Sequence, residues 1–343
     1  MMNYRKVYLF TLSFLLLIVI SCKHKQFKVP ISEIDLKINI HRFENDLFTI
    51  QPDSIPFALP ELQDKYGNFL TVFGYVTNIG NPSDEKYPYF LQSFVSNKTN
   101  ADVYHIIQEE FADMTDIDIK LNSGFKHYKY YFPKKNIPEI YTFISGFNNS
   151  IVIDTDILAI GLDRYLGPKC KYYKELGIPQ YLTKKMVKEK IPSDCMSAWG
   201  RTEFNLKYNK NEKISDNVLN NIIYEGKLKY FIKAMMPDEP DELIMGFTSE
   251  QLAWCEKNEG EMWTYLIENK LLYSTDYLEI RKLIGDAPFT SFFPKESPGQ
   301  AAIWLGYRII SKYMENTPQE SLPELMKNTD YQNILHLSKY NPN

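Results

Sequence analysis

The chain has 343 residues and a formal net charge of -4, with 39 lysines and arginines against 43 aspartates and glutamates. Hydrophobic residues make up 44% and charged residues 24%, a composition that excludes extensive disorder and suits one large folded domain or two modest ones. The lack of a basic excess argues against nucleic acid as a partner.

The first residues have the layout of a secretory signal peptide. Residues 1–6 are basic, and residues 7–20 are almost wholly apolar but too short to span a bilayer comfortably. The sequence VISC at 19–22 resembles a bacterial lipobox. That resemblance implies cleavage between Ser21 and Cys22, with diacylglycerol on the Cys22 sulfur and an acyl chain on the new amine, together a stable membrane anchor. The alternative is an uncleaved anchor helix in which Cys22 is incidental.

A basic tether and a single body follow the expected cleavage point. Residues 23–28 read KHKQFK, a segment that suits anionic lipid headgroups. No acidic run follows Cys22, which favours an anchor that faces the periplasm. The sequence therefore predicts a signal peptide over residues 1–21, a lipidated tether over 22–30 and one domain over 31–343.

Three cysteines remain in the body: Cys170, Cys195 and Cys255. In an oxidising compartment this odd number leaves two arrangements open, one disulfide with one thiol or three thiols. No C-x-x-C pair occurs, so neither a zinc ribbon nor thioredoxin chemistry is indicated.

The first half of the body mixes helical and extended patterns. Alternating apolar residues predict a strand over 34–40, and amphipathic patterns predict helices over about 56–76 and 101–113. Residues 139–145 and 150–154 are rich in β-formers and are separated by Gly146-Phe147-Asn148-Asn149, and a third apolar run covers 157–161. We expect these runs to form a small central sheet that is mostly antiparallel.

The second half of the body reads as almost wholly helical. Apolar periodicity and Pro or Gly punctuation predict helices over about 183–208, 216–236, 248–270, 276–285 and 298–314. Thr248 and Gln251 form a capping box at a helix start. The last of these helices is apolar nearly all round, so it is expected at the centre, and Gly299 and Gly306 would let it approach its neighbours closely. The fold class is therefore α+β and predominantly helical.

The common signatures of hydrolytic sites are missing. The sequence has no G-x-S-x-G elbow, no Walker A motif and no G-x-G-x-x-G. It has five histidines, no H-x-x-x-H, and no histidine between residues 143 and 331. A histidine-ligated zinc site in the C-terminal helical half is therefore excluded, because zinc hydrolases hold the ion with imidazoles. We expect no catalytic residue, no metal and no cofactor.

Motifs spread along the body carry a family resemblance. They are VID at 152–154, IGLDRYLG at 160–167, NIIYEGK at 221–227, QLAWCEKNE at 251–259, LYSTD at 272–276 and PGQA at 298–301. With the lipobox, their order and spacing resemble the gliding-motility lipoprotein B family of Bacteroidota over nearly the whole mature chain. The resemblance implies a role in the cell envelope, with protein partners in the gliding or associated secretion machinery.

That family is in turn distantly similar to predicted zinc metallopeptidases of the gluzincin kind. In those proteins an H-E-x-x-H helix precedes a helix whose Glu-Gly pair supplies the third zinc ligand. Glu225 and Gly226 match the Glu-Gly pair, but the segment that would carry H-E-x-x-H, around 194–199, has neither histidine. The resemblance thus implies a metallopeptidase-like scaffold without its metal.

Four polar residues are candidates for a groove or for structural roles. Glu225 has two readings, an i,i+4 pair with Lys229 or a groove carboxylate surviving from a metal site. Glu259 falls on a core-facing stripe, so we expect it to form a buried or half-buried ion pair with Arg308. Asp163 follows the last β-rich run, where it would cap the next segment, bind a ligand or accept a hydrogen bond near Arg164.

Three functions remain open from the sequence. The leading expectation is a non-enzymatic envelope lipoprotein that binds protein partners and the membrane. The second is a residual hydrolase that uses carboxylates such as Glu225 and Glu259. The third is a periplasmic module that binds peptide or glycan.

Overall fold

The computed structural model describes residues 27–205 and 216–342. Residues Ile31–Asn343 form one compact unit, separate from Met1–Pro30. The signal segment with Ser21 and Cys22 lies outside the described residues, as does the end of the helix expected over 183–208. The expected start of that helix is wrong: the α-helix begins only at Ile191, where Pro192 stands in the first turn, a position that proline favours. Within the described ranges no helix has both the length and the apolarity needed to cross a bilayer.

Helices dominate the body. Between the first strand of the sheet and the other three strands they are α2 (Phe43–Phe48), α3 (Ile55–Tyr66), α4 (Asn68–Val76), α5 (Tyr87–Ser96), α6 (Lys98–Glu110) and α7 (Thr115–Tyr131). After the sheet they are α8 (Lys171–Glu175), α9 (Gln180–Thr183), α10 (Ile191–Glu203), α11 (Val218–Met235), α12 (Asp241–Met245), α13 (Ser249–Lys257), α14 (Glu259–Glu268), α15 (Tyr277–Ile284), α16 (Ala301–Asn316), α17 (Leu322–Lys327) and α18 (Tyr331–Ser338).

Two of the expected helices are each divided by a turn. The region 56–76 forms α3 and α4, because Gly67 between them takes a left-handed backbone with φ of 48°. The region 248–270 forms α13 and α14, with Asn258 at the break. The capping box of Thr248 and Gln251 is confirmed at the start of α13.

The strand expected over 34–40 is wrong. Strand β1 covers only Ile40–Arg42. The apolar alternation before it reflects burial against a helix instead, because Ile38 is 5% exposed. The side chain of Asn122 on α7 takes the place of a strand partner: its Oδ1 accepts from the Ile38 N–H at 2.7 Å, and its Nδ2 donates to the Ile38 carbonyl at 3.3 Å.

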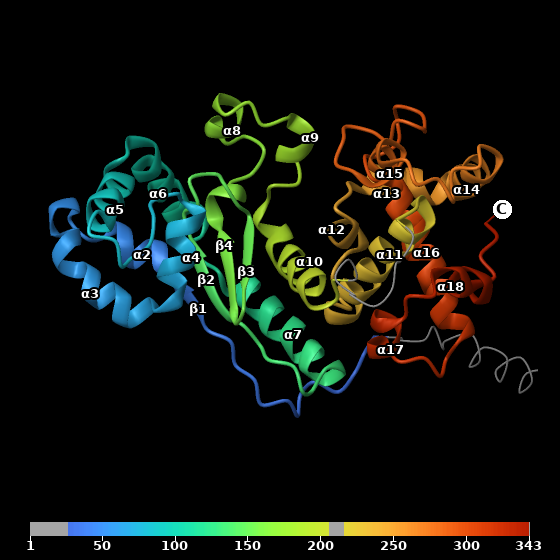
Figure 1. Cartoon of the computed structure of the whole chain (residues 1–343), viewed down its shortest axis with the longest axis horizontal. Coiled ribbons are helices and arrows are strands. Elements are labelled where there is room, and N and C mark those ends of the chain that lie inside the picture. Colours follow the sequence, from blue (N-terminus) through green and yellow to red (C-terminus); the bar gives the residue numbers. More distant parts are fainter. Residues whose placement is uncertain (1–26, 206–215, 343) are drawn as a thin grey trace, which may run out of the picture. The chain divides into compact units, whose positions relative to one another are not determined.

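The sheet is mixed, so the expectation of a mostly antiparallel sheet is also wrong. The other strands are β2 (Glu139–Phe143), β3 (Ile151–Asp154) and β4 (Ile157–Gly161), and the order is β1-β2-β4-β3. β1 pairs with β2 and β2 with β4 in parallel, and only β3 and β4 are antiparallel. After β2 the chain skips the neighbouring strand position and forms β3 at the edge of the sheet. β4 then fills the skipped position between β2 and β3 (Figure 1).

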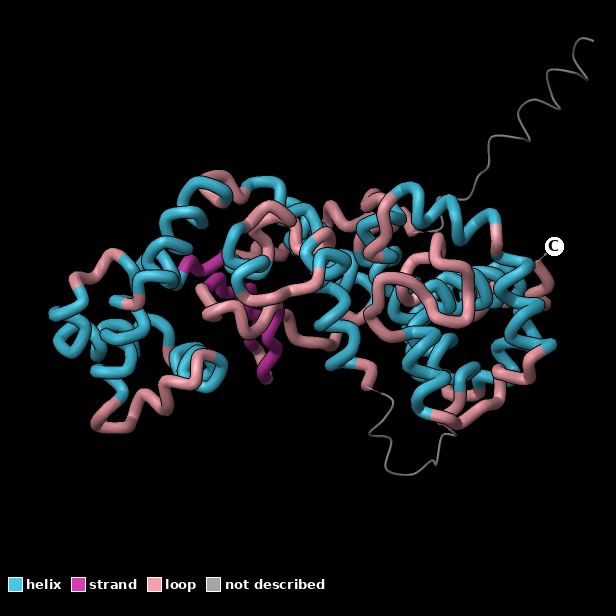
Figure 2. The backbone as a smooth tube through the Cα atoms, turned by 90° about the horizontal axis from the view of Figure 1, so that it is seen from above, coloured by secondary structure: helices cyan, strands magenta, loops and turns pink. Residues whose placement is uncertain are grey.

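Both faces of the central strands are covered. Tyr141 and Phe143 of β2 and Ala159 of β4 share a core with the aromatic side chains of α2–α5, while Ile140 and Leu158 are fully buried as well. α10 packs on β3 and β4 and also on α7. The strands occupy a single narrow zone with helices on either side (Figure 2).

The C-terminal helices are organised around the contact of α11 with α16. A Cβ at Gly306 would lie 1.9 Å from the Ile222 carbonyl oxygen, and one at Gly226 would lie 2.2 Å from the Gly306 carbonyl carbon. The expected close approach of Gly306 is therefore confirmed. Gly299 also lies against backbone, because a Cβ there would come within 2.0 Å of the Ala287 carbonyl oxygen.

Candidate functional site

α10 and α11 lie side by side. α10 carries segment 194–199, where a gluzincin-type peptidase would have H-E-x-x-H, and α11 carries Glu225, which matches the third zinc ligand. Glu225 of α11 faces α10, where Arg201 holds both of its carboxylate oxygens: Nη1 to Oε1 is 2.8 Å and Nη2 to Oε2 is 2.5 Å. The Glu225 side chain is 11% exposed and that of Arg201 is 45% exposed. Such a two-pronged pair matches the planar fork of guanidinium to the carboxylate.

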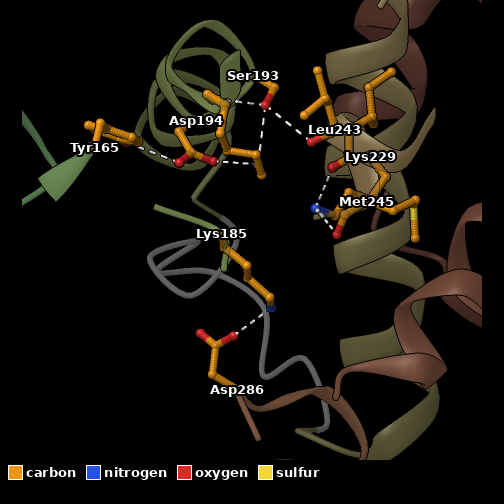
Figure 3. A network of polar contacts seen from close by, with 10 residues as sticks. Tyr165, Lys185, Ser193, Asp194, Lys229, Leu243, Met245 and Asp286 are labelled. Atoms are coloured by element: carbon orange, nitrogen blue, oxygen red, sulfur yellow. Dashed lines mark hydrogen bonds and ion pairs between the residues drawn. The ribbon is translucent and has the colours of Figure 1, made fainter. Parts of the chain in front are cut away.

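The i,i+4 pair of Glu225 with Lys229 is not formed. The Lys229 ammonium instead donates to the carbonyls of Ile244 at 2.8 Å and Met245 at 3.4 Å, at the end of α12 (Figure 3). These carbonyls carry the negative end of the helix dipole and lack helical donors, so a cation is well placed there. Burial, and next the nearby Lys190 cation, lower the pKa of Lys229 to about 7.

A second polar cluster lies at the start of α10. Lys190 is 8% exposed, and its ammonium donates to Asp194 Oδ1 at 2.5 Å and to Ser193 Oγ at 3.1 Å. Tyr165 donates to Asp194 Oδ2 at 3.0 Å, and Ser193 Oγ donates to the Leu243 carbonyl at 3.2 Å (Figure 3). The cluster therefore ties α10 to the end of β4 and to α12.

Ser193 and Lys190 do not have the arrangement of a serine–lysine nucleophile. Ser193 is fully buried, and its hydroxyl is bonded to two backbone carbonyls, those of Lys190 and Leu243. The Lys190 ammonium donates to Asp194 and to Ser193 Oγ, so in this geometry it is the donor toward the Ser193 hydroxyl and not a base that accepts its proton. The pair positions chain segments, and its cation faces the pocket described next.

A pocket of about 390 Å³ adjoins this cluster. Three segments line it, 180–190, 242–251 and 287–299, and its charged lining residues are Lys184, Lys185, Lys190 and Glu242. The Lys185 ammonium lies 3.1 Å from Asp286 Oδ1, so an ion pair connects the first segment to the start of the third (Figure 3). The remaining walls are largely apolar: Val187, Leu243, Phe247, Ala287, Pro288 and Pro298.

A family model described as gliding motility protein GldB matches residues 24–342. The chain belongs to the GldB family. Membership makes it a gliding motility-related lipoprotein associated with the membranes of the cell envelope. The comparisons give no match among curated proteins and none among solved structures.

In this GldB-family chain the side chains at the expected metal-ligand positions do not form a site for a hydrolytic metal ion. Glu225, which would supply the third ligand, already has both oxygens on Arg201. α10 has no histidine over 194–199. Among the residues that the structure describes, no group of three or more histidine, cysteine or acidic side chains is placed to hold a metal ion.

The three body cysteines are all free thiols. Burial raises the pKa of the Cys255 thiol to about 12 and that of Cys195 well above its ordinary value. A thiol is a weak ligand and nucleophile until it ionises. Cys195 and Cys255, which are buried, therefore act as small apolar packing residues.

Glu259 and Arg308 are brought together, away from the pocket lining. Arg308 Nε lies 3.1 Å from Glu259 Oε2, and the side chains are 37% and 13% exposed for Arg308 and Glu259. Glu259 also accepts from Trp304 Nε1 at 2.9 Å and from the Tyr340 hydroxyl at 3.0 Å. The carboxylate thus joins α14, α16 and the C-terminal segment.

Asp163 is fully buried and holds the loop that carries the chain over β4. Its Oδ1 accepts from the Ser145 N–H at 2.9 Å and from Ser145 Oγ at 3.0 Å, and its Oδ2 accepts from the Phe147 N–H. Burial raises the pKa of this carboxyl, while these hydrogen bonds act in the opposite direction. Asp163 neither caps a following helix through its side chain nor lines the pocket.

Sequence reasoning missed the pocket and the partner of Glu225. The segment TKKMVKEK at 183–190 offered a signal, because it places three of the pocket's charged residues in one short basic run. Arg201 lies 24 residues before Glu225, so no helical spacing connects the two. Only the packing of α10 on α11 makes them neighbours.

Proposed function

We propose that this chain is a non-catalytic lipoprotein of the gliding or associated secretion apparatus, anchored by acyl chains on Cys22 and acting through protein partners. The observation that carries the proposal is the pair of Arg201 with Glu225. A peptidase-like scaffold would hold a metal cation against this carboxylate. Here a guanidinium supplies the positive charge and leaves no open coordination position for a water nucleophile.

The N-terminal sequence supports the anchoring part of the proposal. The basic start, the short apolar run and the position of Cys22 agree with lipidation. The segment KHKQFK at 23–28 would then lie against anionic lipid headgroups. Without an acidic run after Cys22 the body is assigned to the periplasmic side. Its function there is binding, with no cofactor and no nucleic acid.

The proposal is tested in a deletion strain of a gliding host, scored for colony spreading and for secretion. The strain is complemented with wild type, with the double variant Arg201→Gln/Glu225→Gln, and with Cys22→Ala. We expect the double variant to restore both phenotypes, because it removes both charges and leaves neither unpaired. Cys22→Ala is expected to leave the membrane fraction and to fail.

A matched control replaces an exposed pair of like chemistry, Lys312→Gln/Glu315→Gln, whose atoms lie 2.8 Å apart on α16. Each purified variant is checked by its melting temperature. If the double variant folds as wild type does but restores nothing, while the control restores both phenotypes, Glu225 has a chemical role. Chelator-sensitive peptide cleavage by the purified protein would equally overturn the proposal.

A further inference from the structure

We propose that the pocket between segments 180–190, 242–251 and 287–299 binds an acidic peptide segment, with one carboxylate next to an apolar side chain. This inference rests on the proposed function, because it names the chemistry of the partner. Four observations support it: the charge of the lining, the burial of Lys190, the start of α13, and the apolar walls.

The lining is basic on a chain that is acidic as a whole. It carries three lysines against Glu242, although Lys185 and Lys190 are paired with Asp286 and Asp194, which lie outside the lining, and the full chain has a net charge of -4. Among the described residues Lys184 has no ion-pair partner, and its side chain is exposed at the pocket edge. An acidic segment would therefore be attracted here and weakly repelled elsewhere on the surface.

Lys190 contributes a cation that is already desolvated. It is 8% exposed and held by Asp194 and Ser193, and its methylene chain lies 3.5 Å from the Cβ position of Gly246, another lining residue. An ammonium has three N–H donors, and these two contacts use two of them. The third is available to an incoming carboxylate at little cost in side-chain entropy.

The start of α13 adds partial positive charge at the same place. Thr248 and Gln251, the capping-box residues of this helix, both line the pocket. The N–H groups of Thr248 and Gln251 already donate within the capping box, so an anion here would be favoured by the positive end of the helix dipole and not by these two donors. The start of α13 and the Lys190 ammonium would both attract the same carboxylate of the peptide.

The apolar walls and the size of the pocket select a short peptide over a bare ion. About 390 Å³ lies at the lower end of the range for ligand sites, which suits a few residues of extended chain. The wall at 287–299 is held close by Gly299 against Ala287, and the Lys185–Asp286 pair fixes the wall opposite. No arginine lines the pocket, and Glu242 would oppose a dianion, so a single carboxylate fits better than a phosphate.

Fluorescence anisotropy on the detergent-solubilised full chain tests the inference. The probe is a fluorescein-labelled, C-terminally amidated peptide GSLDLGS, compared with its uncharged twin GSLNLGS. We expect the acidic peptide to bind about tenfold more tightly than the twin, with an advantage that shrinks in high salt.

Variants locate the binding. Lys184→Gln changes only the exposed edge, and Lys190→Met removes the buried cation. Each is expected to weaken binding of the acidic peptide about tenfold and to leave the twin unchanged. Lys188→Gln is the matched control, because Lys188 lies in the same basic run but does not line the pocket. The edge variant Lys184→Gln keeps the test valid if Lys190→Met fails to fold.

Equal binding of the two peptides, or equal losses in Lys188→Gln and the edge variant, would overturn the inference. So would displacement of the probe by millimolar inorganic phosphate, which would mark a phosphate site. These outcomes do not touch the proposed function, which depends on spreading restored by Arg201→Gln/Glu225→Gln. Loss of spreading in that variant with peptide binding intact would overturn the function and leave the pocket as a binding site.

Discussion

The sheet region, from β1 to β4 with α2–α6, and the C-terminal helical region, from α11 to α18, bury their polar groups in different ways. In the sheet region buried carboxylates accept hydrogen bonds: Asp163 accepts from Ser145, 18 residues away, and Glu44 accepts from Thr142, 98 residues away. In the helical region lysines of α11 donate to backbone carbonyls: Lys227 reaches Met326, 99 residues away, and Lys229 reaches Ile244, 15 residues away. The first region therefore buries acceptors, whereas the second buries ammonium donors.

Aromatic side chains fill the core of the sheet region. Phe43 makes edge contacts with Tyr66, Phe69 and Phe73, and Phe69 stacks on Tyr141 with ring centroids 4.3 Å apart. Such pairs add about 0.5–1.5 kcal/mol each beyond their area burial. The core of the sheet region therefore joins α2, α3 and α4 to β2 through aromatic side chains.

The helical region uses α11 as a source of cations. Lys227 donates to the carbonyls of Met326 at 3.2 Å and Asn328 at 2.7 Å, at the end of α17. Lys229 serves the end of α12, and Lys233 donates to the Glu239 carbonyl at 3.0 Å. The last carbonyls of a short helix have no donor within that helix. The lysines of α11 donate to carbonyls at or near such helix ends. The pocket lies beside one of these ends, on α12.

The strongest way to break the helical region is to separate α11 from α16. In Gly306→Ala the new Cβ would lie 1.9 Å from the Ile222 carbonyl oxygen, a backbone atom that cannot rotate away. We expect a loss of about 4 kcal/mol or more, enough to remove cooperative melting of the C-terminal helices. Circular dichroism melts measure it.

Gly124→Ala is the matched control for that prediction. Gly124 also lies in a helix, α7, but its new Cβ would meet only the flexible side chain of Met196, at 3.4 Å. Helix propensity favours alanine there, so a neutral or slightly raised midpoint is expected. A Gly306→Ala protein that melts with wild type would show that the helix contact is looser than the structure indicates.

The sheet region is most sensitive at Asp163. Replacing it with alanine leaves the N–H groups of Ser145 and Phe147 without an acceptor in a buried loop. We expect a loss of about 3 kcal/mol in the free energy of unfolding, measured with urea. Asp154→Ala is the control, since its exposed carboxylate bonds only to the adjacent Thr155, and its midpoint should stay near that of wild type. Equal midpoints for both variants would contradict the role of Asp163.

Sequence periodicity predicted the helical region well because its signals are local. The helices expected over 216–236, 276–285 and 298–314 appear as α11, α15 and α16, with ends within a few residues. The close approach of Gly306 followed from an apolar helix that contains glycine. Each of these inferences needs only residues within one helix.

The sheet order and the site needed information that one sequence does not contain. Gly146 to Asn149 separates two β-rich runs that a mostly antiparallel sheet would pair directly, but β3 forms one strand position away from β2 and β4 lies between them. Gly161 permits this crossing, because a Cβ there would lie 2.1 Å from the Asn149 carbonyl oxygen. The pocket likewise joins three segments that no spacing relates.

The ion pair of Glu259 with Arg308 differs from the other polar contacts of the helical region, because it is a long-range contact at a partly exposed site. Arg308 is 37% exposed, so solvent screens the pair and Arg308→Met should cost only about 1 kcal/mol. Glu259→Leu should cost more, about 2–3 kcal/mol, since Trp304 and Tyr340 lose their acceptor as well. A double-mutant cycle measured with urea gives the coupling. Equal losses in the two single variants would refute this asymmetry.

The smallest expected effect is a pH dependence from Lys227. Burial lowers the pKa of its ammonium from 10.5 to about 7, so above pH 7 the unfolded chain binds the proton more tightly than the folded one. The free energy of unfolding therefore rises as pH increases from 7 toward 10.5, and this contribution is lost as pH falls through 7. Lys227→Met should remove up to about 1.4 kcal/mol per pH unit of that rise, measured with urea between pH 7 and 9. Lys327→Met, an exposed lysine on α17, should keep the slope of wild type. Parallel curves for wild type and Lys227→Met would mean that the two carbonyls hold this ammonium in its charged form despite its burial.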